Sequence, residues 1–166
     1  MEPDQSATEI GERLKEELDS RSIARADALC VVDRTQVEIR EFTLPPAPDS
    51  ELPNLVRFQA KSEFTALNED WLLDYVPFDG IADGPRRVLA TAMAPDHVDR
   101  LTKISEAAGT KFKRALFRPY ALCDLMADRL GDENERLIVD PNGEQIDLTV
   151  TNGSSCLLYT SDAADE

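Results

Sequence analysis

Three closely spaced prolines at the start of the stretch from residue 44 to residue 64 constrain the fold more than any other feature of this sequence. The stretch reads LPPAPDSELPNLVRFQAKSEF. Proline donates no backbone hydrogen bond, so Pro45, Pro46 and Pro48 must end the apolar strand that precedes them. Apolar residues then recur every three or four positions, which predicts a helix over residues 49–66 with one buried face. That face consists of Leu52, Leu55, Val56, Ala60 and Phe64.

The prolines before this helix have two interpretations. In the first, they end the strand and lead into the helix, which the side chains of Asp49 and Ser50 can cap. The same prolines satisfy the pattern PxxP, which suits an SH3-type groove. We favour the simpler interpretation, in which the prolines end a strand and lead into a helix.

The order of elements from residue 37 to residue 117 is strand, helix, strand, strand, helix, strand. We expect the strands at 37–44, 71–78, 87–93 and 111–117, and a second helix between Pro95 and a stop at Gly109. Pro77 predicts an edge position for the second of these strands. The order is that of a two-layer, ferredoxin-like βαββαβ unit, so the predicted fold class is α+β.

The apolar pattern of the strand at 37–44 changes phase along its length. Val37 and Ile39 are at odd positions, whereas Phe42 and Leu44 are at even positions. We interpret the change as a β-bulge near Arg40 and Glu41.

Further elements flank this unit. Residues 1–25 predict an amphipathic helix with a capping box from Ser6 to Glu9. Its narrow apolar stripe needs a sheet to cover, and we expect its natural neighbour to lie upstream of this chain. Residues 28–32 predict a buried strand. A helix from Pro119 to Gly131 precedes two strands, 136–140 and 145–150, whose Asn-Gly turn is a strong hairpin signal. The stripe of the first helix consists of Ile10, Leu14 and Leu18.

Charge and hydropathy exclude several classes of partner. The formal net charge is -15, which argues against nucleic acid and is compatible with a basic peptide or with plain solubility. No apolar run approaches the roughly 20 residues of a membrane span, so we expect no direct membrane insertion. Any membrane role would come through a partner.

Chemistry-bearing residues are sparse. Cys30, Cys123 and Cys156 are far apart, which indicates buried thiols of a cytosolic protein instead of a disulfide frame or a metal site. His97 is the single histidine and has no partners in the sequence. No nucleophile elbow, P-loop or Rossmann glycine pattern occurs, so we predict neither catalytic residues nor a metal site.

The last eleven residues do not continue the pattern before them. CLLYTSDAADE resembles the translation of a transposase-type sequencing adapter, whose mosaic end would encode residues 156–161. We therefore expect residues 153–166 to be a non-native tail. Without its Asp162, Asp165 and Glu166 the net charge changes from -15 to -12.

Three segments together resemble the PilM family of type IV pilus assembly, in the actin-like ATPase superfamily. They are VEIREFTLPPAPDSELPNLVRFQAKSEF, VLATAMAPDHVDRLTKISEAAGTKF, and RPYALCDLMADRL followed by RLIVDPNGEQIDLTV. The resemblance covers about residues 8–152 and extends to the cytoplasmic part of GspL and, more distantly, to FtsA. It implies an inserted SHS2-like 1C subdomain at 36–118, flanked by pieces of subdomain 1A at 1–35 and 119–152, in a chain truncated at both ends.

The resemblance also implies a function. The intact protein would be a cytoplasmic scaffold of a type IV pilus or type II secretion platform, peripheral to the inner membrane. It would hold a PilN-like cytoplasmic tail in a groove between subdomains 1A and 1C. The alternatives are a nucleotide-binding actin-like ATPase and a free-standing ferredoxin-like domain, residues 36–118, that binds a small ligand.

The candidate cofactor site is the hairpin turn at residues 140–145. In the superfamily this turn usually reads Asp-x-Gly-(Gly/Ala)-x-Thr and faces phosphate and Mg²⁺. Asp140 and Gly143 match it, whereas Asn142 and Gln145 replace the first Gly and the Thr, Pro141 removes a donor and Glu144 adds a negative charge. We therefore expect weak or no ATP binding, no enzyme activity and no cofactor in this chain, and leave ATP and Mg²⁺ to a longer parent protein.

Overall fold

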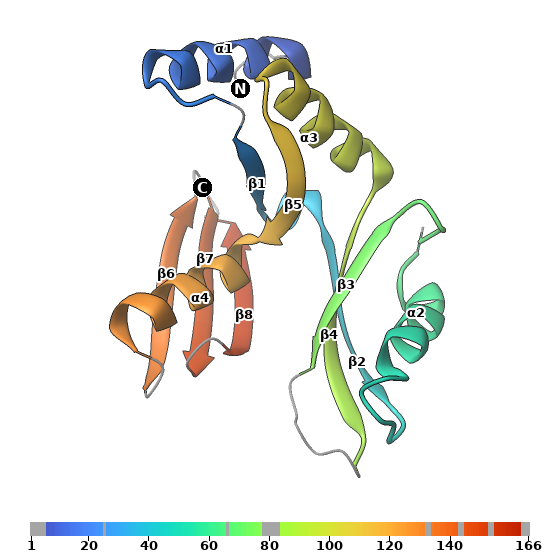
Figure 1. Ribbon diagram of the computed structural model, residues 1–166. Coiled ribbons are helices and arrows are strands. Elements are labelled where there is room, and N and C mark those ends of the chain that lie inside the picture. The colour runs from blue at the N-terminus through green and yellow to red at the C-terminus, as the bar shows by residue number, and fades with distance from the viewer. Residues whose placement is uncertain are drawn as a thin grey trace.

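The computed structural model describes residues 6–24, 26–65, 67–77, 84–131, 134–142, 145–152 and 155–163. Helices and strands are mixed along the chain (Figure 1). They are α1 (Ala7–Ser20), β1 (Asp27–Val32), η1 (Arg34–Gln36), β2 (Glu38–Leu44), α2 (Leu52–Glu63), β3 (Leu72–Pro77), β4 (Arg86–Met93), α3 (Pro95–Ala107), β5 (Lys111–Phe117), α4 (Arg118–Leu130), β6 (Glu135–Asn142), β7 (Gln145–Asn152) and β8 (Ser155–Ala163). The α+β class and the predicted element order are confirmed.

The described strands form separate sheets. β2, β4 and β3 are antiparallel in that order, so β3 lies at an edge as Pro77 predicted. The fourth strand of the predicted unit does not join them. Instead, β5 pairs in parallel with β1, and the amide of Lys111 donates to the carbonyl of Ala26 at 3.1 Å. The ferredoxin-like pairing is therefore wrong for β5, because the edge of β1, outside the predicted unit, takes up this strand.

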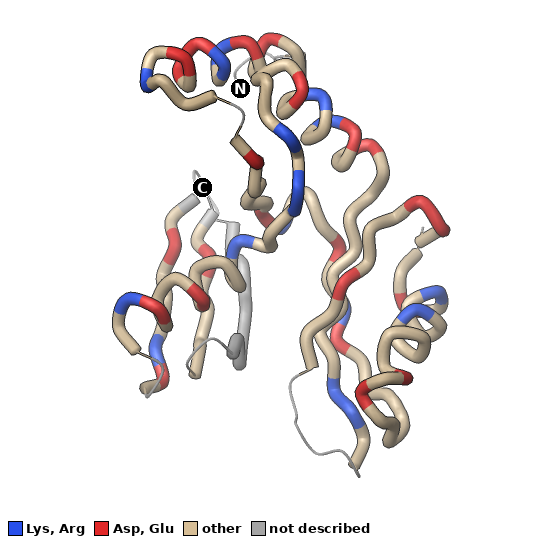
Figure 2. Tube along the Cα trace, viewed as in Figure 1, with Lys and Arg blue, Asp and Glu red and all other residues tan. Residues whose placement is uncertain are grey.

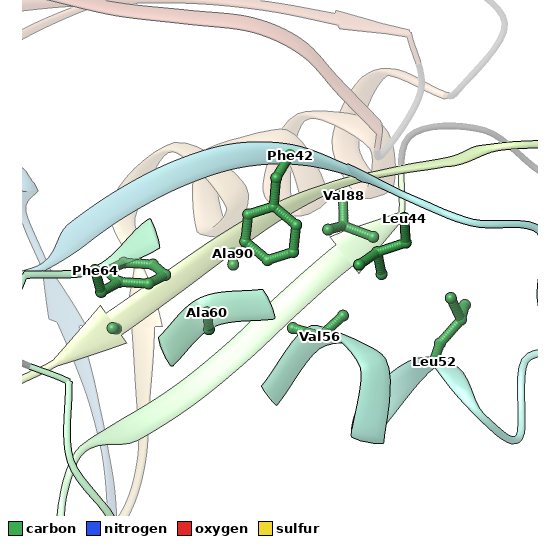
Figure 3. Close-up of a cluster of buried hydrophobic side chains, with 9 residues drawn as sticks. Phe42, Leu44, Leu52, Val56, Ala60, Phe64, Val88 and Ala90 are labelled. Carbon is green, nitrogen blue, oxygen red and sulfur yellow. The ribbon is translucent and has the colours of Figure 1, made fainter. Parts of the chain in front are cut away.

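The main core lies between α2 and one face of the β2–β4–β3 sheet (Figure 3). Leu52, Val56, Ala60 and Phe64 are at most 3% exposed, which confirms the predicted face of the helix. The same cluster takes in residues from two strands, Phe42, Leu44, Val88, Ala90 and Ala92. Burial of one helix face against alternate strand positions is what holds this layer together.

The predicted β-bulge in β2 is wrong. β2 pairs with β4 in unbroken register, from Glu38 opposite Ala92 to Leu44 opposite Arg86. The change of apolar phase has another cause. Val37 and Ile39 belong to a second cluster on the other face of the sheet, which also contains Val32, Met93 and Phe117. Successive side chains of a strand point to opposite faces, so one regular strand serves two cores.

Asp49 anchors the proline elbow, residues 45–50, and does not cap α2. The N-cap of α2 is Glu51, and its side chain makes no capping hydrogen bond, so the predicted capping by Asp49 or Ser50 is wrong. The Asp49 carboxylate instead accepts from Arg86 Nη2 at 2.9 Å. Arg86 also donates to the carbonyl of Ala47 at 3.2 Å and is only 4% exposed. A buried guanidinium thus ties the elbow to β4.

The capping box of α1 is confirmed, and α1 lies against α3. The amide of Glu9 donates to Ser6 Oγ at 3.2 Å, and the amide of Ser6 donates to Glu9 Oε2 at 2.9 Å. The contact with α3 passes through Gly11, where a Cβ would lie 2.5 Å from Ala107 Cβ. Leu14, part of the predicted apolar stripe, is 42% exposed.

Exposure differs from expectation along β1. Val32 is buried, but Leu29 is 61% and Val31 55% exposed, so the prediction of a buried strand holds for one face only.

The β6–β7 hairpin is confirmed. β8 is formed by residues of the predicted non-native tail, and it pairs antiparallel with β7.

Among the described residues, no helix has both the length and the apolar character that a membrane crossing requires.

Candidate functional site

A groove of about 590 Å³ lies between the β2–β4–β3 sheet and β5. Its floor is the sheet face opposite α2, and its wall is β5 with the first turn of α4. A groove of this size falls in the range of ligand pockets. The apolar residues of its floor are Leu72, Val76, Leu89 and Met93, and those of its wall and inner end are Phe112, Ala115, Leu116, Phe117, Tyr120, Val32 and Val37.

Strand alternation explains why the groove is apolar. Leu73 and Tyr75 of β3 pack against the α2 core, so their neighbours point to the opposite face. On that face Leu72 is 49% and Val76 37% exposed. At the inner end, the rings of Phe117 and Tyr120 are 6.1 Å apart between centroids. The groove therefore offers partly exposed apolar surface in front of a packed aromatic end.

Charged side chains form the rim of the groove. Asp74 lines it on the β3 side, and Lys113 and Arg114 line it on the β5 side. Figure 2 shows Lys and Arg positions along β5 and Asp and Glu positions on many of the other elements. Lys113 Nζ lies 3.7 Å from Asp27 Oδ2, and both side chains are exposed, so this ion pair contributes little to stability.

No cluster of three or more His, Cys, Asp or Glu side chains in the described part could hold a metal. Cys123 is buried, as predicted, whereas Cys30 is only partly buried. Burial raises the pKa of Cys30, and a hydrogen bond with Ser105 opposes the rise, which does not suit a thiolate nucleophile.

Asp140, one of the predicted hairpin residues, is engaged by Arg118. Arg118 Nε donates to Asp140 Oδ2 at 2.5 Å, and Nη2 donates to Oδ1 at 3.0 Å. The side chains are 31% and 16% exposed. Gly143, the other predicted residue, and Glu144 lie outside the described residues. The structure thus brings Asp140 together with a cation from the start of α4.

The described side of the hairpin does not fit a site for Mg²⁺ and phosphate. Both carboxylate oxygens of Asp140 already accept from a guanidinium. Asp147, directly across the hairpin from Asp140, is only 3% exposed. Pro141 supplies no amide to a phosphate oxygen. Weak or absent ATP binding remains a prediction.

Sequence reasoning missed Arg118 and the residues that line the groove. Arg118 and Asp140 are 22 positions apart, and no local pattern joins them. The groove did leave a signal. In WLLDYVP apolar residues occupy both odd and even positions, which indicates that both faces of the strand contact apolar surroundings.

Comparisons with solved structures show the fold. The chain matches a structure of the PilM-PilN type IV pilus biogenesis complex with a TM-score of 0.79 and 19% identity, over 93% of this chain and 48% of that chain. It matches the cytoplasmic domain of EpsL, an inner membrane component of the type II secretion system of Vibrio cholerae, with a TM-score of 0.62 and 14% identity, over 92% and 56%. The chain therefore spans about half the length of the structures that it matches.

These matches confirm the predicted resemblance at the level of fold. The chain shares its fold with about half of the matched chain of the PilM-PilN complex and of the EpsL cytoplasmic domain. No family model matches the sequence, and neither does any curated protein.

Proposed function

We propose that this chain is part of an assembly component of a type IV pilus or type II secretion platform. Its groove would bind the cytoplasmic tail of a PilN-like inner-membrane protein. The component would work on the cytoplasmic side and be peripheral to the inner membrane, because the partner supplies the anchor. The likeness in fold to a PilM-PilN complex and to the cytoplasmic domain of an inner-membrane secretion component supports this proposal.

The observation that carries the proposal is the partly exposed apolar floor of the groove. Leu72 and Val76 lie on the same face of β3, two side-chain repeats apart. Leu89 of β4 is opposite Val76 on that face. An extended peptide repeats its side chains every two residues on one face, so it can place successive apolar side chains over such a floor. Polar and charged groups at the rim would leave the peptide backbone in contact with water.

A peptide-binding assay tests this proposal. The probe is a fluorescently labelled peptide with the sequence of the cytoplasmic tail of an inner-membrane pilus or secretion assembly protein from the same genome. We expect saturable binding, and we expect Leu72→Asp to weaken it at least about tenfold, because burying one leucine contributes about 1.5–3 kcal/mol.

Phe58→Asp is the matched control. Phe58 is 77% exposed on α2, on the side of the sheet away from the groove. Both substitutions replace an exposed apolar side chain with a carboxylate, and only one of them changes the groove. Equal affinity of the two variants for the peptide would show that the groove is not the binding site.

A further inference from the structure

Arg118, at the start of α4, pairs with Asp140 and is under the electrostatic influence of two further acidic residues, Asp147 and Asp33. The carboxylate of Asp140 in β6 accepts hydrogen bonds from Nε and Nη2 of Arg118. Asp147 of β7 lies directly opposite Asp140 in the hairpin, and Asp33 follows β1. The pKa of Arg118 is raised by its hydrogen bond to Asp140 and further by the charges of Asp140, Asp147 and Asp33, while burial opposes the rise.

Without a cation this junction of α4 and the hairpin would be unfavourable. Like charges directly opposite each other on one face of a strand pair repel, and Asp147 is almost fully buried. A protein can neutralise such a pair with a bound metal ion or with one of its own side chains. The guanidinium of Arg118 is permanently charged, and its planar edge matches the two oxygens of one carboxylate.

We propose that Arg118 is a built-in cation for this junction, so that the hairpin is joined to α4 with no need for Mg²⁺ or nucleotide. The proposal goes beyond the binding function above and does not depend on which peptide occupies the groove. In this arrangement the Mg²⁺ and ATP of actin-like proteins have no role at the described hairpin residues, because Arg118 already holds the carboxylate that would face them.

The position of Arg118 extends its effect to the groove. Arg118 is the first residue of α4, and Phe117 before it is the N-cap of that helix. Phe117 and, two residues after Arg118, Tyr120 form the aromatic inner end of the groove. The ion pair with Asp140 therefore fixes the backbone that carries these two rings. The groove keeps its shape in the absence of any ligand at the hairpin.

Thermal unfolding with and without ligand tests the proposal. We expect the Tm of the protein to be the same with and without millimolar MgCl₂ and Mg-ATP, at matched ionic strength. Arg118→Gln should lower Tm by about 5 °C. Arg118→Gln combined with Asp140→Asn should lower it no further than the more harmful single variant, because the two side chains act as one pair. Arg129→Gln, at an exposed position of the same helix, is the matched control and should change Tm by less than about 1 °C.

Two results would overturn the proposal. One is a rise of Tm with Mg-ATP that Asp140→Asn abolishes, since Asp140 would then serve the nucleotide. The other is additivity of the two single substitutions. Should Arg118→Gln fail to fold, NMR of the unchanged protein decides the matter. A slowly exchanging Arg118 Nε–H signal that Mg-ATP leaves unshifted supports the built-in cation, and a rapidly exchanging or ATP-shifted signal refutes it.

Discussion

Replacing Gly11 with alanine should push α1 away from α3 and destabilise the protein. A Cβ at position 11 would lie 2.5 Å from Ala107 Cβ and 2.6 Å from the carbonyl oxygen of Ile104, whereas ordinary contacts lie at 3.4–4 Å. The helices must therefore separate by about 1 Å or distort. The Ile104 oxygen belongs to the main chain and cannot rotate away, so the strain cannot be relieved by a change of rotamer.

The magnitude follows from two opposing effects. Overpacking costs about 1–3 kcal/mol, and a contact with main-chain atoms places Gly11→Ala near the upper end. Alanine favours a helix over glycine by about 1 kcal/mol, which offsets part of this cost. We expect a net loss of about 2 kcal/mol in the free energy of unfolding, or a fall in Tm of about 4–8 °C.

Urea unfolding and amide hydrogen exchange measure this effect. The amides of α1 should lose protection in Gly11→Ala, while those of β4 keep theirs. Glu12→Ala, an exposed neighbour in the same helix, should stay within about 0.5 kcal/mol. Adding Ala107→Gly should restore stability only in part, because the Ile104 oxygen remains. If Gly11→Ala is as stable as the unchanged protein, the close approach of α1 and α3 does not exist in solution.

Three further predictions concern the core, the elbow and a thiol. Phe42→Ala should cost about 3–5 kcal/mol in a urea melt, because its ring is buried under α2, whereas Phe58→Ala, at a 77% exposed position, should stay within about 0.5 kcal/mol. Asp49→Asn should destabilise by about 1 kcal/mol, since the buried Arg86 keeps a hydrogen bond but loses its counter-charge, and most of Asp49 is in water; no change in Tm would argue against this role. Because burial raises the pKa of Cys30, its labelling by a maleimide should be slower than that of free cysteine at pH 7 and should accelerate only above the usual thiol range; fast labelling at pH 7 would contradict this.

Features set by neighbours in the sequence could be predicted, and those set by distant partners could not. The capping box of α1 and the buried face of α2 depend on residues three or four positions apart. Their patterns therefore appear in any short window of the sequence. The edge position of β3 followed in the same way from Pro77, since its ring removes a donor whatever the rest of the sheet does.

Each error arose where a distant segment decides the structure. The phase change in β2 looked like a bulge because the second apolar surface, formed by Met93 and Phe117, lies far along the chain. β5 left the predicted unit because β1 offered an edge for it. Asp49 was expected to cap α2, but Arg86, 37 positions away, takes its carboxylate.

The candidate site shows the same division. The turn pattern singles out Asp140, but the guanidinium that binds this carboxylate comes from another element. The groove likewise depends on how β5 sits across the sheet, which a pattern within one strand does not report. Its floor was nonetheless visible in the sequence of β3, where both faces are apolar.

The apolar side chains on both faces of β2 also favour its correct register with β4 during folding. A slip of one residue along β4 would turn Phe42 and Leu44 toward the groove and Ile39 toward α2. Both hydrophobic layers would then lose their contacts at the same time, whereas a strand with one polar face would lose contacts in a single layer. A misaligned pairing of β2 would therefore lose stability in both hydrophobic layers. The correct register is favoured without a bulge or a special turn to fix it.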